Sequence, residues 1–160
     1  MKPSRVGLAP PPPSHLVPYL LSRAYNGFTR AWMEHLRDHG VTMAQWQILA
    51  ILSEYDGARI GQLAEMSATA QAVTSRVVDQ MERDGLVERQ AVPDDRRAVE
   101  VRLTARGRVT FETLLPEANA LMDGAMEGID PANAQALMDG LACIISNLAG
   151  AAAVPEHVRA

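Results

Sequence analysis

The residues best suited to chemistry in this 160-residue chain form a short polar group whose spacing suits contact with DNA bases. Gln71, Ala72, Ser75 and Arg76 recur at the three- and four-residue spacing of one helix face. A glutamine amide can pair with adenine, and an arginine can pair with guanine or bind a phosphate. Thr69 precedes them and is predicted to cap their helix. The alternative is a polar face that only contacts solvent.

Other chemistries have less support. His35 and His39 are four residues apart and could share a metal ion, but no cysteine or carboxylate group accompanies them, so we predict no metal site. The single cysteine, Cys143, rules out an internal disulfide, suits a reducing cytoplasm and is expected to be a buried, inert thiol. Without a nucleophile elbow or a phosphate-binding glycine loop, we predict neither an enzyme nor a cofactor. No apolar run reaches about 18 residues, so no membrane span is expected.

Charge is distributed unevenly along the chain. The formal net charge is −4, yet residues 76–108 carry eight arginines and seven acidic residues. A weakly basic segment on an acidic body suits a protein that contacts DNA through one face, although it would suit a catalytic domain equally well. The chain has one lysine, Lys2, so arginine must supply phosphate binding.

Hydrophobic periodicity and capping residues predict the elements that position the polar group. Ser14 is a plausible first N-cap, although Pro18 could move the start of that helix toward Val17. Thr42 is predicted to cap the second helix. The predicted helices and strands are helices 14–38, 43–54, 60–66 and 70–84, strands 86–90 and 99–103, and helices 105–128 and 131–148, with Pro116 expected to bend or break the helix that contains it.

The helix over residues 70–84 has two distinct faces. Thr74, Val77, Val78 and Met81 form an apolar stripe that should face the core and leave the polar group outward. A β-hairpin with residues 93–97 (PDDRR) at its tip follows directly, and it would reach the flanking DNA backbone or minor groove. The sequence therefore predicts a mainly α (α+β) fold, a winged helix-turn-helix with a two-stranded β-wing.

The first and last helices are too long and too apolar for the small central module to cover. Two chains could bury these faces against each other, so we expect a homodimer. The predicted organisation is a flexible proline-rich tail over residues 1–13, one domain over residues 14–150 and a frayed segment over residues 151–160. Within the domain, the winged helix takes residues 42–104, and the dimerisation helices take residues 14–38 and 105–149.

The sequence resembles the MarR family of winged helix-turn-helix transcriptional regulators over residues 16–148. Three segments in order carry the resemblance: residues 77–89 (VVDQMERDGLVER), residues 94–98 (DDRRA) and residues 103–107 (LTARG). Residues 42–46 (TMAQW) also look like the family's start to its second helix. Thr74 departs from the pattern, because the family usually has an aliphatic residue there. We expect its hydroxyl to bond to the carbonyl four residues earlier.

The resemblance implies a homodimer in which each subunit binds half of a pseudo-palindromic operator on double-stranded DNA. It implies that Arg97 enters the minor groove, that Asp95 orients it and that Arg96 contacts a phosphate. The chain would then be a ligand-responsive regulator, most often a repressor. The alternative is a winged-helix protein-interaction module without DNA binding.

The resemblance also implies a small aromatic or phenolic effector, such as an aromatic acid or its thioester, at the junction of the first two helices with the winged domain. The candidate ligand-binding residues are Arg23, Tyr25, Phe28, Met43 and Trp46. An apolar cleft with one or two cationic groups would suit an aromatic carboxylate. The alternative is that these aromatic residues only form core.

Overall fold

The computed structural model describes residues 12, 16–55, 57–92 and 95–149, without the side chains of residues 92, 95–98 and 149. The predicted tails at residues 1–13, apart from Pro12, and 151–160 lie outside the described residues. The elements are α1 (Val17–Asp38), α2 (Met43–Glu54), α3 (Ile60–Met66), α4 (Gln71–Arg83), β1 (Val87–Val92), β2 (Asp95–Leu103), α5 (Ala105–Ala125) and α6 (Pro131–Ala149).

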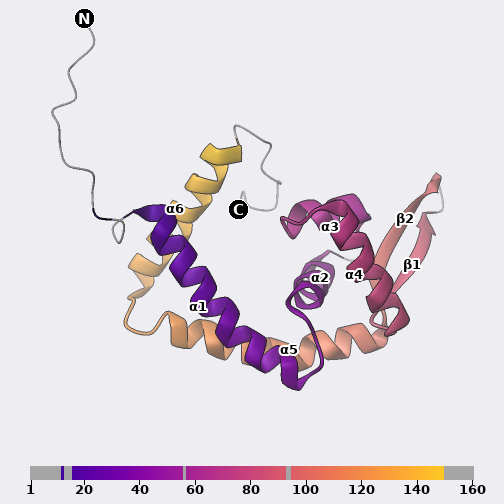
Figure 1. The fold of residues 1–160 in the computed structure, drawn as a ribbon, viewed down its shortest axis with the longest axis horizontal. Helices are drawn as coiled ribbons and strands as arrows, with labels where there is room; N and C mark the ends of the chain where they lie inside the picture. Colours follow the sequence, from indigo (N-terminus) through magenta and orange to yellow (C-terminus); the bar gives the residue numbers. More distant parts are fainter. Residues whose placement is uncertain (1–11, 13–15, 56, 93–94, 150–160) are drawn as a thin grey trace, which may run out of the picture.

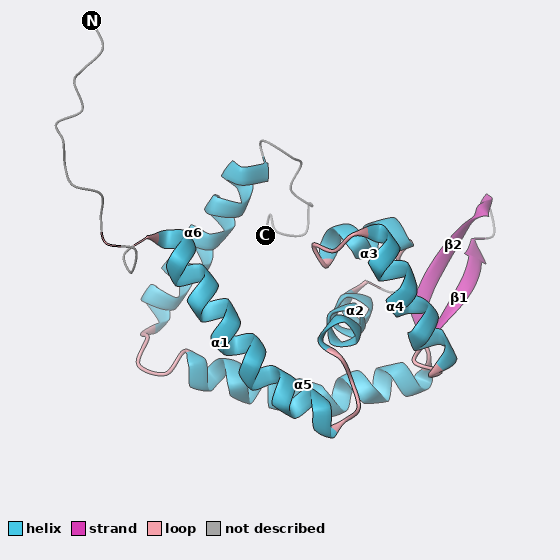
Figure 2. Cartoon of the chain, in the orientation of Figure 1, coloured by secondary structure: helices cyan, strands magenta, loops and turns pink. Residues whose placement is uncertain are grey.

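Helix α5 forms the base of the molecule, as Figure 1 shows. Helix α1 crosses the middle of α5 and rises toward the end where α6 lies, and α2, α3, α4 and the hairpin stand over the other end. The chain is mostly helical with one two-stranded antiparallel sheet (Figure 2). This arrangement confirms the predicted fold class.

Helix α1 begins at Val17, the later of the two starts that the sequence offered. Its N-cap is Leu16, which makes no side-chain capping hydrogen bond, and a proline stands in the first turn. The prediction that Ser14 caps this helix is therefore wrong. The physical reason is Pro18, whose ring is tolerated in a helix only within the first turn, so the helix starts immediately before it.

Helix α2 is the central element of the core and has the N-terminus that was predicted. Thr42 Oγ1 accepts a hydrogen bond from the Gln45 backbone N–H at 3.2 Å, and Gln45 Oε1 accepts one from the Thr42 N–H at 2.8 Å. This reciprocal capping box fixes where the helix begins. Ile48, Leu49 and Leu52 are all at most 2% exposed, so α2 is buried on the faces that meet its neighbours.

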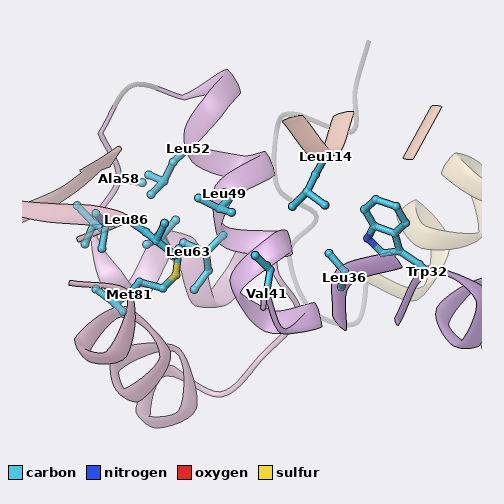
Figure 3. Close-up of a cluster of buried hydrophobic side chains, with 14 residues drawn as sticks. Trp32, Leu36, Val41, Leu49, Leu52, Ala58, Leu63, Met81, Leu86 and Leu114 are labelled. Atoms are coloured by element: carbon cyan, nitrogen blue, oxygen red, sulfur yellow. The ribbon is translucent and has the colours of Figure 1, made fainter. Parts of the chain in front are cut away.

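One continuous hydrophobic core joins the winged domain to the long helices, as Figure 3 shows. Trp32 and Leu36 of α1 lie at one end beside Leu114 of α5, while Leu63 and Met81 lie at the other. The whole cluster is made of side chains that are 7% exposed or less. Because close-packed cores transmit displacement, a movement of α1 or α5 must also displace the side chains of α4 that pack in this core.

The outer halves of the long helices keep their apolar faces exposed. Helix α5 ends at Ala125, short of the predicted residue 128, and it continues through Pro116 without a break in the helix. Apolar side chains on α1, α5 and α6 remain open to solvent: Val17, Leu20, Leu21, Tyr25, Met33, Val109, Leu115, Met122, Leu137, Met138, Ile145 and Leu148. Large apolar side chains exposed in this number suit an interaction surface.

The hairpin is longer than predicted and has a different tip. Val87 pairs with Leu103, and the register stays regular as far as Ala91 and Val99. The register then steps to a pairing of Val92 with Asp95. Residues 96–98 therefore have no Cα partner in this register and form an irregular part of β2, whereas the sequence had placed Arg96 and Arg97 in the tip itself. A bulge of this kind redirects side chains at a functional edge.

The end of α4 is locked to the start of α5. Thr104 Oγ1 donates to the Gly85 carbonyl at 2.6 Å, and the same oxygen accepts from the Gly107 N–H at 3.0 Å. Gly85 has a φ of +69°, which glycine adopts without steric cost. A Cβ on Gly107 would lie 2.0 Å from the Leu86 carbonyl oxygen. The DGL and LTARG segments are therefore two halves of one joint that fixes where α4 and the hairpin sit on α5.

Candidate nucleic-acid interface and effector cavity

The turn before α4 does not cap the helix in the way that was predicted. The N-cap is Ala70, without a side-chain capping bond, and Thr69 Oγ1 instead donates to the Ser67 carbonyl at 3.0 Å. The prediction that Thr69 caps this helix is wrong, because its hydroxyl holds the preceding turn together. That turn contains Ala68, whose φ of +50° is in the left-handed region that residues with a side chain seldom adopt.

The two faces of α4 are those that the sequence predicted. Thr74 is 2% exposed, and its Oγ1 donates to the Ala70 carbonyl at 3.3 Å. Val78 and Met81 are fully buried, and Val77 packs against the core. On the other side, Gln71, Ala72 and Arg76 are exposed and Ser75 is half-buried, so the side chains proposed for base contact share an open surface.

An ionic cluster attaches α4 to the hairpin, and sequence reasoning missed it. The Arg89 guanidinium on β1 binds the Asp79 carboxylate through Nη2 and the Glu82 carboxylate through Nη1. The Asp79 carboxylate on α4 is therefore occupied by this fork. Two contacts to one planar guanidinium fix direction as well as distance, so the cluster sets the angle between α4 and the wing.

The wing residues Asp95, Arg96 and Arg97 are placed by their backbone only. All three belong to β2, next to or within the irregular part of the hairpin. Their side chains lie outside the described residues. The assignments of Asp95 as an orienting carboxylate and of Arg96 and Arg97 as DNA contacts therefore remain predictions from the sequence.

A cavity of about 670 Å³ lies between α1, α2 and the turn that leads into α4. Tyr25 and Trp46, two of the five predicted ligand residues, line it. The other lining residues are Gln47, Ala50, Ile51, Met66, Ser67, Ala68 and Thr69. Sequence reasoning missed this second group, which faces Trp46 only after α3 folds back over α2. The described lining includes no cationic side chain, which differs from the expected cleft with one or two cations.

The other three predicted ligand residues lie elsewhere. Phe28 lines a separate apolar cavity of about 780 Å³ between α1, α5 and α6, which Tyr25 also borders. Met43 lines a groove of about 330 Å³ beside the α1–α2 loop. Arg23 is exposed on α1 and is not among the lining residues of these cavities. The five residues therefore do not form one site within a single subunit.

Aromatic packing holds Trp46 in place at the edge of the first cavity. The rings of Trp46 and Phe111 stack with centroids 5.4 Å apart, and Trp32 meets Trp46 edge-on at 5.0 Å. Such pairs add about 0.5–1.5 kcal/mol beyond the area they bury. Trp46 is thus both a core residue and a cavity wall, which combines the two alternatives that the sequence left open.

Two histidines at the end of α1 share one carboxylate of α5. His35 Nδ1 lies 3.0 Å from Glu117 Oε2, and His39 Nε2 lies 2.9 Å from Glu117 Oε1. The hydrogen bonds with His39 and His35 hold the pKa of the Glu117 carboxyl below its ordinary value. This bridge joins α1 to the middle of the base helix. Within the described residues, no group of three His, Cys, Asp or Glu side chains is arranged to hold a metal ion.

Glu117→Gln is expected to reduce the acid sensitivity of folding. A carboxyl whose folded pKa is lowered stabilises the fold above its ordinary pKa of about 4.3, and that contribution is lost as pH falls through the lowered value. The thermal midpoint of the parent should therefore fall more steeply than that of the variant between about pH 5 and pH 3. Glu112→Gln, on an exposed residue of the same helix, is the matched control. Parallel curves for the parent and Glu117→Gln would contradict this account.

None of the described helices combines the length and the apolar character that crossing a membrane requires.

Comparison with known proteins agrees with the family resemblance seen in the sequence. The profile of the MarR family matches residues 41–99, which run from the start of α2 into the hairpin.

Solved structures and curated relatives extend this match over most of the chain. A MarR-family transcriptional regulator from Silicibacter pomeroyi superimposes with a TM-score of 0.79, is 31% identical, and the alignment covers 88% of this chain and 95% of that one. Bordetella bronchiseptica BpsR, whose DNA binding is regulated by 6-hydroxynicotinic acid, aligns with a TM-score of 0.74 and 27% identity over 82% of this chain and 94% of its own. The HTH-type transcriptional repressor IacR of Pseudomonas putida is 25% identical over 81% of this chain and 78% of its own.

These relatives are named as transcriptional regulators and not as enzymes, in agreement with the sequence-based prediction. The exposed polar face of α4, the hairpin attached to it and the extended alignment support one assignment. The chain belongs to the MarR family of DNA-binding transcriptional regulators.

Proposed function

We propose that this regulator acts in the cytoplasm as a homodimeric repressor that binds a pseudo-palindromic operator and is released by a small aromatic effector. The observation that carries the proposal is the exposed polar face of α4, held beside the hairpin by Arg89, in a chain whose outer helices keep their apolar faces open. A second copy would cover those faces. The two-fold axis would present two copies of α4 to successive major grooves about 34 Å apart.

The DNA contacts divide by chemistry. Gln71 and Ser75 suit hydrogen bonds to base edges, and Arg76 suits guanine or a phosphate. Among the described residues, Arg76 is ion-paired with no carboxylate, so its charge is available to DNA. Thr69 and Ala72 lie at the start of the same surface, and Arg96 and Arg97 would reach the backbone and minor groove, with Asp95 orienting the guanidinium.

Arg76→Ala is expected to weaken binding to the duplex upstream of the protein's own gene by about tenfold or more, because one base-contacting arginine contributes about 1–3 kcal/mol. Each subunit of the dimer would lose this arginine contact. The affinity of the parent for the duplex should also fall steeply with log salt concentration. Arg30→Ala removes an exposed arginine from α1 and is the matched control. Equal affinities for the two variants in a fluorescence-anisotropy titration would refute the assignment of Arg76.

The cavity lined by Tyr25 and Trp46 is the proposed effector site. Its volume of about 670 Å³ is that of a small-molecule pocket. Ser67 and Thr69 donate their hydroxyl hydrogens to the backbone carbonyls of Ala64 and Ser67. The Gln47 amide and the Tyr25 hydroxyl therefore supply the donors for an oxygen on the ligand.

The neutral lining favours a small hydroxylated aromatic ligand with at most one charge over a highly charged ligand. BpsR responds to 6-hydroxynicotinic acid, a molecule of that class, which supports the same class for this chain. A ligand in the cavity would touch residues 66–69, the turn that leads directly into α4. If it binds one dimer geometry better than another, a coupling of about 1–3 kcal/mol is enough to change operator affinity by about 5–150-fold.

Gln47→Ala is expected to remove most of the thermal stabilisation that an effector gives. A ligand at about 100 times its dissociation constant stabilises the folded state by about 2.7 kcal/mol, which a melting assay resolves easily. The assay should screen aromatic acids, 6-hydroxynicotinic acid among them, and their coenzyme A thioesters. Gln135→Ala, on the exposed surface of α6, should respond as the parent does. If no compound stabilises the parent, the effector proposal fails.

A further inference from the structure

A further recess lies at the opposite end of α4 from the residues proposed to read DNA. Its volume is about 540 Å³, and it opens where the α1–α2 loop, the end of α4 and the first turns of α5 converge. The polar residues that line it are His39, Gln45, Arg83, Asp84, Arg106 and Thr110. It shares no lining residue with the cavity at Tyr25 and Trp46, so it is a separate site.

Two guanidinium groups in this recess have no anionic partner among the described residues. Arg83 Nη2 donates to Gln80 Oε1 at 2.7 Å, and a Cβ placed on Gly85 would lie 4.0 Å from Arg106 Nη1. In the part of the chain that the structure describes, neither arginine is ion-paired with a carboxylate, whereas Arg89 forms two such pairs. The two guanidinium groups in the recess therefore have N–H donors that remain available to an anion.

The acidic groups nearby are engaged with other partners. Asp84 Oδ1 accepts from Gln80 Nε2 at 2.8 Å, and Asp84 Oδ2 accepts from Gln45 Nε2 at 3.4 Å. Glu117 is held by His39 and His35. Neutral amides thus satisfy the one carboxylate that lines the recess, and two arginines against one aspartate leave a net positive charge there.

We propose that this recess binds an oxyanion, a phosphate or carboxylate group carried by a small metabolite. Arginine forks match the planar geometry of carboxylates and the oxygens of phosphates, and charge-assisted bonds of this kind are about twice as strong as neutral ones. The volume accommodates a small organic molecule around the anionic group. This anion site is inferred from the geometry of the recess alone and does not require the proposed operator or effector.

The position of the recess gives the bound anion a structural consequence. Arg83 belongs to the last turn of α4 and Arg106 to the first turn of α5, so one anion would join the two helices. It would reinforce the joint formed by Thr104, Gly85 and Gly107. An anion held by both guanidinium groups therefore stiffens the attachment of α4 to the base helix.

The test is an NMR titration of the full-length protein with inorganic phosphate and, separately, with succinate, against sodium chloride of equal ionic strength. Saturable shifts of the Gly40 and Gly85 amides are expected below about 10 mM ligand. A response to phosphate alone assigns a phosphoryl group, and a response to succinate assigns a carboxylate. DNA binding is not part of this measurement, so its outcome is independent of the operator proposal.

The double variant Arg83→Gln/Arg106→Gln should lose these shifts or need at least about tenfold more ligand, which is about 1.4 kcal/mol. Both side chains are exposed, and the circular dichroism spectrum should show that the variant folds. Arg30→Gln removes an arginine elsewhere and should titrate as the parent does. The proposal is overturned if the parent shifts do not saturate, if chloride reproduces them, or if the double variant responds like the parent.

Discussion

Gly107→Ala is expected to destabilise the fold by about 3 kcal/mol or more, the largest effect on stability that we predict for a single methyl group. The new Cβ would meet the Leu86 carbonyl oxygen at 2.0 Å, its carbon at 3.0 Å and Leu103 Cδ2 at 3.3 Å. Two of these atoms are backbone and cannot rotate away. Relief requires α5 to move from the hairpin, which breaks the Thr104 bonds to Gly85 and Gly107.

Denaturant titration of Gly107→Ala against the parent measures this effect directly. Gly61→Ala is the matched control, because a Cβ on Gly61 of α3 meets nothing within 4 Å and alanine has a higher helix propensity than glycine. The control should be neutral or slightly stabilising. A Gly107→Ala variant as stable as the parent would show that the joint between α4 and α5 is not tightly packed.

Leu148→Glu is expected to raise the dimer dissociation constant by about 100-fold or more and to weaken operator binding with it. Leu148 is 71% exposed in the single chain, so the substitution costs the monomer little. In the proposed dimer the carboxylate would be buried against apolar helices, and an unpaired buried charge costs several kcal/mol. Each 1.4 kcal/mol is a tenfold change in the constant.

Sedimentation over a concentration series measures that constant. Ser146→Glu adds the same charge to the same helix two residues away, on the side opposite the stripe formed by Leu137, Leu141 and Leu148. It should leave the dimer intact. Equal dissociation constants for Leu148→Glu and the parent would remove α6 from the dimer interface.

Patterns within one element were readable from the sequence. The stripe of Thr74, Val78 and Met81 predicted which face of α4 is buried, because that depends only on a period of 3.6 residues. Thr42 predicted the start of α2, because capping is a local interaction. Pro18 also acts locally, and it placed the start of α1 at Val17, the alternative that the sequence offered to a cap at Ser14. The cap expected from Thr69 was wrong, because Thr69 donates its hydroxyl to its own turn.

Contacts between elements were not readable. Arg89 meets Asp79 and Glu82 only because the hairpin folds back along α4. Glu117 meets His35 about 80 residues away, a separation that periodicity does not reach. The proposed effector cavity shows the same limit, because the family resemblance implied Trp46 while residues 66–68 became wall residues through the packing of α3.

The continuous core provides a physical route by which the proposed effector and the proposed operator would influence one another. Trp46 packs on Phe111 of α5 and Trp32 of α1, and it also lines the cavity beside the turn before α4. A ligand in this cavity would touch Tyr25 of α1, Trp46 and the turn before α4, and Trp46 in turn packs on α1 and α5. These packed side chains form a contiguous route between the two proposed sites. Both ligands would bias the equilibrium between two dimer geometries.

The most direct test of the central claim is selection of bound duplexes from a random DNA pool by the full-length protein. Two copies of α4 related by a two-fold axis should enrich an inverted repeat whose half-sites are centred about 10 base pairs apart. The Arg76→Ala variant should enrich the same spacing with relaxed preference within each half-site. If no sequence is enriched at about 50 mM salt, where phosphate contacts are strong, the chain is a winged-helix interaction module and not a repressor.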